Sequence, residues 1–220
     1  MSLKKTQQVF SGLNLIGNFI ESPLRVGDIV FHDDGEHKVW GNIEDLVPGF
    51  TLADKLISSN KSDLKFTTES GIDISIGGMA GSPVASGEVQ LKFNNKNSAF
   101  VSLKQIQRTV VKLGLVNAAL TKIWEENGFN KLSKKMHYHF ISDVITAESG
   151  TVIFSQDRDN KILLKGKNNA PIGSVLEIGS GQVELASSSK ATLEIISATK
   201  ISPLYTAMRY KSNGDFEVVG

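Results

Sequence analysis

The sequence predicts an α+β fold: a twisted, mostly antiparallel sheet with one long amphipathic helix and short peripheral helices. Two stretches, residues 70–105 and 135–166, alternate apolar and polar residues. Strand side chains change face at every residue, so this alternation indicates one wet and one apolar face. Between these stretches apolar residues recur at helical spacing. The helices interrupt the strands without alternating regularly with them, which favours α+β.

Composition limits the function classes. The chain has 220 residues, of which 40% are hydrophobic and 21% charged, as in a globular protein. We expect a single domain over residues 1–220. A net charge of +1 gives no global reason to expect nucleic acid, and the lack of cysteine excludes disulfides, thiolate metal sites and a cysteine nucleophile. No apolar run approaches the ~20 residues of a spanning helix.

The first third of the chain predicts a helix and a hairpin. Residues 3–20 are apolar at roughly helical spacing and predict a helix, or a helix running into a strand. Residues 26–31 and 38–40 flank Asp34-Gly35, a dipeptide that favours a tight turn. Residues 51–56 predict a helical turn.

The two alternating stretches predict ribbons with an apolar face. The first bends at the small residues 77–83, and the second at 148–150 and 157–160. Either a half-buried soluble sheet or a ribbon that enters a bilayer would show this pattern. The residues expected to enter the bilayer are Ile72, Ile74, Ile76, Val89, Leu91, Phe93, Tyr138, Phe140, Val144, Val152, Phe154, Ile162 and Leu164.

The helix between the ribbons is expected over residues 106–124, where apolar residues recur at steps of three and four, and Asn127-Gly128 would end it. Short strands are expected after the second ribbon, at 175–178, 182–185, 191–197, 204–210 and 216–219.

Positive charge is concentrated between residues 104 and 135. Such a surface attracts anionic headgroups at ~1 kcal/mol per Lys or Arg, although a solvated helix face would carry the same charges. The residues expected to bind headgroups are Lys4, Lys5, Lys104, Arg108 and Lys112.

Motifs for catalysis or metal binding are weak. His137 and His139 form an H-x-H pair that could supply two metal ligands, but two polar residues on a wet face explain them more simply. The sequence shows no nucleophile elbow, P-loop or H-E-x-x-H helix. We therefore expect no enzyme, no catalytic residue, no cofactor and no metal.

Insertion would require many copies of the chain. A membrane strand needs ~9–11 residues with every backbone group paired. Each ribbon supplies two arms of about that length, and one chain cannot enclose a channel alone.

The order of elements resembles a known family. Residues 26–40, 70–105 and 135–166, followed by 202–210 and 214–216, are similar to the pore-forming domain of gasdermins, above all the short bacterial and fungal forms. The resemblance implies a protein that is cytoplasmic when inactive, oligomerises on anionic membranes, inserts both regions as β-hairpins and opens a pore that kills the cell. An activating protease is a possible partner in this family, and residues 216–220 leave little or no room for a C-terminal inhibitory segment.

An alternative function is a soluble binding, assembly or immunity module, in which the ribbons pair within one sheet against the helix. A hydrolase is a distant third, because the sequence announces no pocket for it.

Overall fold

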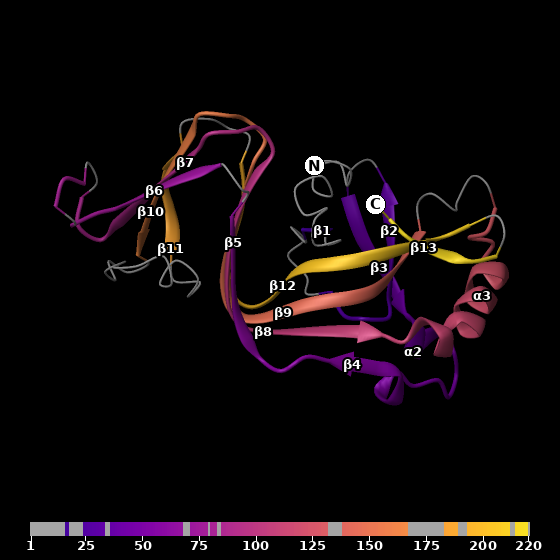
Figure 1. Ribbon diagram of the computed structural model, residues 1–220. Helices are drawn as coiled ribbons and strands as arrows, with labels where there is room; N and C mark the ends of the chain where they lie inside the picture. The colour runs from indigo at the N-terminus through magenta and orange to yellow at the C-terminus, as the bar shows by residue number, and fades with distance from the viewer. Residues whose placement is uncertain are drawn as a thin grey trace. The chain divides into compact units, whose positions relative to one another are not determined.

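The computed structural model describes residues 16–17, 24–33, 36–67, 71–78, 80–82, 85–131, 138–166, 183–188, 193–211 and 214–219 (Figure 1). Its strands are β1 (Ile16–Gly17), β2 (Asp28–Asp33), β3 (Glu36–Asn42), β4 (Leu56–Ser58), β5 (Ser62–Thr67), β6 (Ile72–Ile76), β7 (Glu88–Phe93), β8 (Ser98–Val111), β9 (Tyr138–Ser155), β10 (Asn160–Gly166), β11 (Val183–Ser188), β12 (Leu193–Tyr210) and β13 (Phe216–Val218). Its helices are α2 (Ile43–Leu46), η2 (Ala53–Lys55), η3 (Leu113–Leu115) and α3 (Asn117–Glu126). The sheet is mostly antiparallel, as predicted.

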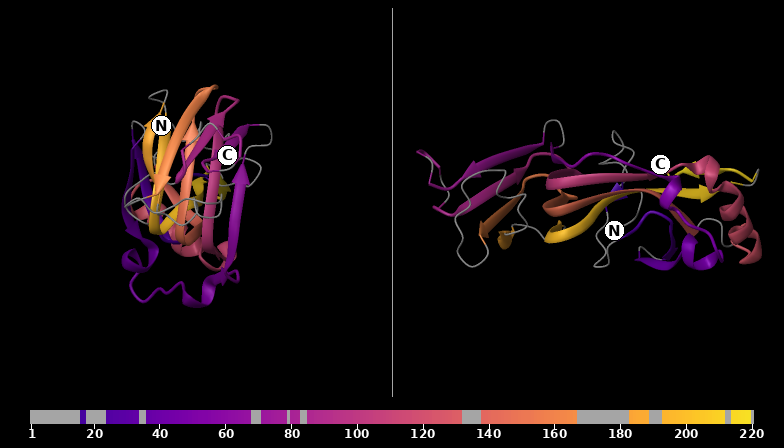
Figure 2. Two further views of the ribbon diagram at one scale, coloured as in Figure 1. Left: turned by 90° about the vertical axis from the view of Figure 1, so that its left-hand side faces the viewer. Right: turned by 90° about the horizontal axis from the view of Figure 1, so that it is seen from below.

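The chain divides into two compact units, each built from separate segments. Unit 1 comprises Met1–Asn60, Gln107–Thr146 and Leu204–Gly220; unit 2 comprises Lys61–Ile106 and Ala147–Pro203. The long strands β8, β9 and β12 contribute residues to both units, and they are neighbours in one sheet (Figure 2).

Unit 1 is held by an aromatic and aliphatic core. The predicted hairpin is β2 and β3, and β2 also pairs with β9, where Ile29 lies opposite Phe140. Helix α3 buries Leu120, Ile123 and Trp124 against this sheet's core. The Trp124 ring meets the edge of neighbouring aromatic rings at centroid distances of 5.0–5.6 Å, a preferred geometry for aromatic pairs.

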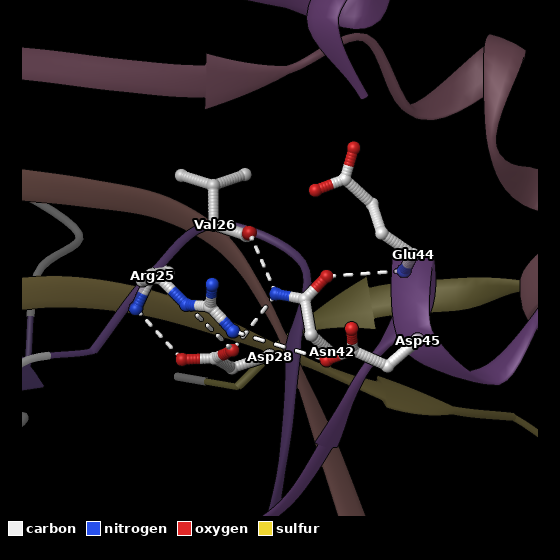
Figure 3. Close-up of polar contacts among 6 residues, drawn as sticks. All are labelled: Arg25, Val26, Asp28, Asn42, Glu44 and Asp45. Atoms are coloured by element: carbon white, nitrogen blue, oxygen red, sulfur yellow. Dashed lines mark hydrogen bonds and ion pairs between the residues drawn. The ribbon is translucent and has the colours of Figure 1, made fainter. Parts of the chain in front are cut away.

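A buried polar cluster joins the start of β2 to α2 (Figure 3). The Asn42 side chain donates to the Asp28 carboxylate at 2.8 Å and to the Val26 carbonyl at 3.2 Å, and its oxygen accepts the Glu44 N–H at 3.1 Å. Asn42 is thus the N-cap of α2. Asp28 also accepts the backbone N–H of Arg25 at 2.7 Å. Burial raises the pKa of Asp28, and these hydrogen bonds oppose that rise.

The long amphipathic helix was predicted wrongly. Residues 106–111 continue strand β8, and the helix proper is only Asn117–Glu126. The β-branched side chains of Ile106, Thr109, Val110 and Val111 favour a strand. Leu56 of β4 pairs with Val111, which extends the ladder to that residue. The predicted end of the helix is correct, since Gly128 has a φ of +64°.

Three further predictions concern strand boundaries. The bend expected at 148–150 is absent, because β9 runs unbroken from Tyr138 to Ser155. The strands expected at 191–197 and 204–210 are one strand, β12. Of the helix expected at 3–20, the structure describes only Ile16–Gly17, a short strand paired with β12, and the strand expected at 175–178 lies outside the described residues.

Within the described part of the chain, no helix is both long and apolar enough to cross a membrane.

Candidate membrane-inserting hairpins

The first candidate hairpin is one ribbon that passes through two sheets of unit 2. Its outgoing arm is β5 and β6, and its returning arm is β7 and β8. In the larger sheet Thr67 pairs with Phe100, and in the four-stranded sheet Ile72 pairs with Phe93. The chain between these pairs is four residues long on one arm and six on the other. This difference is even, so alternate residues keep the same face on both sides of the gap.

The second hairpin has the same construction. Its outgoing arm is β9 and β10, and its returning arm is β11 and β12. In the four-stranded sheet Leu164 pairs with Leu185. In the larger sheet β9 lies beside β12. There a Cβ placed on Gly150 would lie 3.4 Å from Ile201 Cδ1.

The two hairpins pair with each other in both sheets. Leu91 of β7 lies opposite Ile162 of β10, and β8 is hydrogen-bonded to β9. A Cβ on Gly150 would lie 2.3 Å from Leu103 Cδ2, so a side chain at this position would require Leu103 to shift. The strand order β5–β8–β9–β12 is repeated as β6–β7–β10–β11. Unit 2 is therefore one four-stranded antiparallel sheet that turns a corner, and we call residues 94–97 and 156–159 the corner.

The core of unit 2 lies between the two parts of this sheet. Its buried residues are all 0% exposed, and the three isoleucines of β6 pack against them. The members of this core are Val89, Leu91, Phe93, Phe100, Ile153, Ile162 and Leu164.

The corner turns the sheet over. Phe93 and Ile162 enter the core from the four-stranded sheet, whereas Phe100 and Ile153 enter it from the larger sheet. When each strand is followed through the corner, Phe100 lies on the opposite face from Phe93, and Ile153 lies on the opposite face from Ile162. Each corner segment contains a non-glycine residue with left-handed backbone, Asn97 at φ +55° and Asp159 at φ +58°. Asparagine and aspartate tolerate this conformation best among residues with a Cβ.

Buried side chains hold the corner closed. The Ser155 hydroxyl donates to the Asp157 carbonyl at 2.9 Å and accepts the Asn160 amide at 3.2 Å. On the neighbouring strand the Ser98 hydroxyl donates to the Asn95 carbonyl at 3.0 Å. Ser98, Ser155 and Asn160 are at most 1% exposed, so these bonds satisfy groups that water cannot reach.

A bulge fixes the register of the first hairpin. The pairing shifts between Ser62 and Leu64, and Gln105 has a φ of +50°. The Asp63 carboxylate accepts the Gln105 N–H at 2.9 Å. A side chain thus replaces the missing ladder partner at the bulge.

The residues predicted to enter the bilayer divide between two cores. Ile72, Ile74, Ile76, Val89, Leu91, Phe93, Ile162 and Leu164 meet in the core of unit 2. Val152 and Phe154 are fully buried, on the face of β9 opposite Ile153. Tyr138, Phe140 and Val144 belong to the core of unit 1, where the Tyr138 ring stacks on Phe129 at 3.7 Å.

Three of the five predicted headgroup residues lie in the described part of the chain. Lys4 and Lys5 lie outside the described residues. Lys104 and Arg108 are on strand β8, and Lys112 follows it. Arg108 donates through Nε to Asp143 at 2.8 Å and through a second nitrogen, and Asp143 is only 3% exposed. Arg108 therefore neutralises a buried carboxylate, and this hydrogen bond raises the pKa of its guanidinium.

The structure describes only one residue of the H-x-H pair. His139 is buried at 4% exposure, whereas His137 lies outside the described residues. Among the described residues, no cluster of three or more His, Asp or Glu side chains could hold a metal ion.

Sequence reasoning expected the strands at 182–185, 191–197 and 204–210 but did not assign them, as β11 and β12, to the returning arm of the second hairpin. Val183 and Leu185 alternate with Glu184, which is a strand signal. Their partners, Gly166 and Leu164, were not evident from that signal alone.

The chain has a structural likeness among solved proteins. No family model matches the sequence, and no curated protein matches it. The structure is similar to that of a bacterial gasdermin from Bradyrhizobium tropiciagri, with 13% sequence identity, a TM-score of 0.37, and coverage of 98% of this chain and 90% of that chain. A solved gasdermin is thus among the structures to which this chain is similar, as the order of elements led us to expect.

Proposed function

We propose that this chain is a membrane pore-forming protein in which the two hairpins of unit 2 enter a lipid bilayer beside those of other copies. One observation carries the proposal: when the pairing is continued through the corner, the four arms form one sheet with an apolar face. On the first three arms, which end in β6, β7 and β10, the apolar residues of that face are Leu64, Phe66, Ile72, Ile74, Ile76, Val89, Leu91, Phe93, Ala99, Val101, Leu103, Val152, Phe154, Ile162 and Leu164.

The opposite face of the continued sheet is mostly polar and could line water. Phe100, Ile153 and Leu163 are its apolar exceptions in the described part of these arms. Its polar members are Asp63, Lys65, Asp73, Ser75, Glu88, Gln90, Lys92, Ser98, Ser102, Lys161 and Lys165. A strand that separates lipid from water requires this division.

The folded form packs eight of these apolar residues, those of β6, β7 and β10, in the core of unit 2, so their insertion would exchange one apolar environment for another. Backbone pairing would survive this exchange, because both parts of the sheet share one strand order. The strands β6 and β11 are the edges of the four-stranded sheet. In lipid each unpaired edge is costly, so a second copy at each edge is expected.

In this proposal the chain is cytoplasmic until activated, and then binds anionic lipid and kills the cell as a defence protein. Lys104 and Lys112 are the described candidates for headgroup attraction, because Arg108 already holds a buried carboxylate. An activating protease is the proposed trigger.

Dye release from vesicles of phosphatidylcholine and phosphatidylglycerol tests the proposal, with the full chain before and after limited proteolysis. Ile74→Lys puts a charge on the lipid-facing side, where lysine costs ~2–4 kcal/mol near the bilayer centre. We expect at least a roughly tenfold loss of leakage. Ser75→Lys is the matched control on the polar face and should leak like the unmodified chain.

Intact vesicles with folded protein in every form tested would contradict pore formation and favour the soluble binding or immunity module. Equal leakage from both lysine variants would show that Ile74 does not face lipid.

A further inference from the structure

We infer that the corner sets the depth of insertion: residues 94–97 and 156–159 stop at the lipid headgroups, and only hairpin segments beyond them enter hydrocarbon, residues 72–93 of the first hairpin and residues 162–166 and 183–188 of the second. This inference rests on the proposed function and adds to it the level at which the sheet meets the membrane.

A polar belt on the lipid-facing side supports this depth. Between Phe93 and Ala99, and between Phe154 and Ile162, the positions that share the apolar face are all polar or charged. The described residues of the belt are Asn95, Asn97, Gln156, Arg158 and Asn160.

The belt is wide enough to matter. The step from Phe93 to Ala99 is six residues, about 20 Å along an extended strand, against a hydrocarbon core of ≈ 30 Å. Inserting the whole arms would therefore place Arg158 and four asparagine or glutamine side chains deep in lipid. Stopping at the corner places them among headgroups, where polar side chains are hydrated.

The segment beyond the corner is long enough to cross. In the first hairpin, residues 72–82 and 83–93 give about 11 residues on each arm, and a tilted membrane strand needs ~9–11. Residues 74–87 carry no charge, so the tip can pass through the bilayer without burying one.

The corner is charged but has no net charge, because Lys96 and Arg158 are balanced by Asp157 and Asp159. The Lys96 and Arg158 side chains are exposed on the two adjacent corner segments. Arg158 lies 3.8 Å from Asp159, an exposed pair that is worth little in water. At the proposed depth these charged side chains would lie among the hydrated headgroups and not in hydrocarbon.

Single cysteines can measure the depth, because the chain has none of its own. We would label Ile74→Cys beyond the corner, Asn95→Cys at the corner and Leu64→Cys before it, each with an environment-sensitive fluorophore. Ser75→Cys is the control on the polar face. Vesicles would contain lipids with a nitroxide either near the headgroup or deep in the acyl chain, and each labelled protein would also be assayed for leakage.

We expect the deep nitroxide to quench the label at position 74, the shallow one to quench the label at 95, and neither to quench the label at 64. Deep quenching at Leu64→Cys in leaking vesicles would overturn the depth inference while leaving pore formation intact. Intact vesicles with no lipid quenching at any site would overturn both.

A charge test without labels gives an independent result. Leu64 and Ile74 occupy the same face of one arm, on opposite sides of the corner. We expect Ile74→Lys to lose at least about tenfold in leakage, and Leu64→Lys to lose several-fold less than Ile74→Lys. Equal losses from the two correctly folded variants would overturn the inference.

Discussion

For Asp28 the structure predicts the direction in which pH changes the stability of the fold. Burial raises its pKa above the ordinary value near 3.9, so the folded state binds the proton more tightly than the unfolded state. Its contribution to stability is therefore present below the ordinary pKa and lost as pH rises through the raised pKa. We expect the free energy of unfolding of Asp28→Asn to lack this loss when urea unfolding is followed from about pH 3.5 upward.

The quantity to compare is the slope of the unfolding free energy against pH, because Asp28→Asn also changes this free energy independently of pH. The Asp28 carboxylate accepts two hydrogen bonds, and the asparagine side chain would place an amide N–H against one of these donors. Asp73→Asn is the matched control, since the Asp73 side chain is exposed and belongs to unit 2. Parallel pH profiles for Asp28→Asn and the unmodified chain would contradict the assignment.

Arg108 is expected to contribute to stability more than to lipid attraction. Arg108→Gln would leave Asp143 buried with no cation beside it. We expect a loss of about 1–3 kcal/mol in the free energy of urea unfolding. Lys104→Gln, on the same strand, should stay within ~0.5 kcal/mol.

The double variant Arg108→Gln/Asp143→Asn separates the ion pair from other effects. It should recover most of the loss, because the uncompensated buried charge is gone. A double variant as unstable as Arg108→Gln alone would show that the pair is not the cause.

At the scale of elements, the bulge at Gln105 predicts that glycine at this strand position is more stable than valine. Its φ of +50° costs a residue with a Cβ but not glycine. We expect Gln105→Gly to retain or raise the unfolding free energy and Gln105→Val to lower it by about 1–2 kcal/mol, since valine is least tolerant of this conformation. Gln107→Val on the same strand is the control. A tolerated valine at 105 would show that the bulge is not rigid.

The sequence predicts those elements whose pattern is local, and it fails where an element depends on strand partners that are distant in the sequence. Alternation over residues 72–76 and 88–93 correctly predicted a hairpin with one apolar face, because the period of two is local. The helix at 106–124 failed because steps of three and four also fit residues 106–111, whose strand partners are far away in sequence. The corner could not be predicted for the same reason, because no local pattern indicates that the chain passes from one sheet to the other between β7 and β8.

The candidate site follows the same division. Eight of the predicted lipid-facing residues do form one core, since each lies on the apolar side of its own strand. Tyr138, Phe140 and Val144 share that alternation yet pack in unit 1, because β9 is long enough to serve two cores. Only the tertiary pairing separates the two sets.

For the whole molecule, the repeated strand order predicts that the two hairpins need not part when they insert. Lys92 and Lys161 lie opposite each other on adjacent strands of different hairpins. Directly paired residues have Cα atoms ≈ 4.5–5.5 Å apart, within the range that a disulfide spans. We expect the oxidised double variant Lys92→Cys/Lys161→Cys to release dye from anionic vesicles as fast as its reduced form, within about twofold.

The two single-cysteine variants are the controls for the loss of each lysine, and addition of reductant to the same sample isolates the effect of the bond. If the hairpins had to separate before entering lipid, the disulfide would hold β7 against β10 and leakage would return only on reduction. If the sheet keeps its pairing, the oxidised form leaks as fast as the reduced form, because the hydrogen bonds between β7 and β10 already satisfy the backbone groups that would otherwise be unpaired in lipid. The experiment thus tests whether insertion preserves the four-stranded order or rebuilds it.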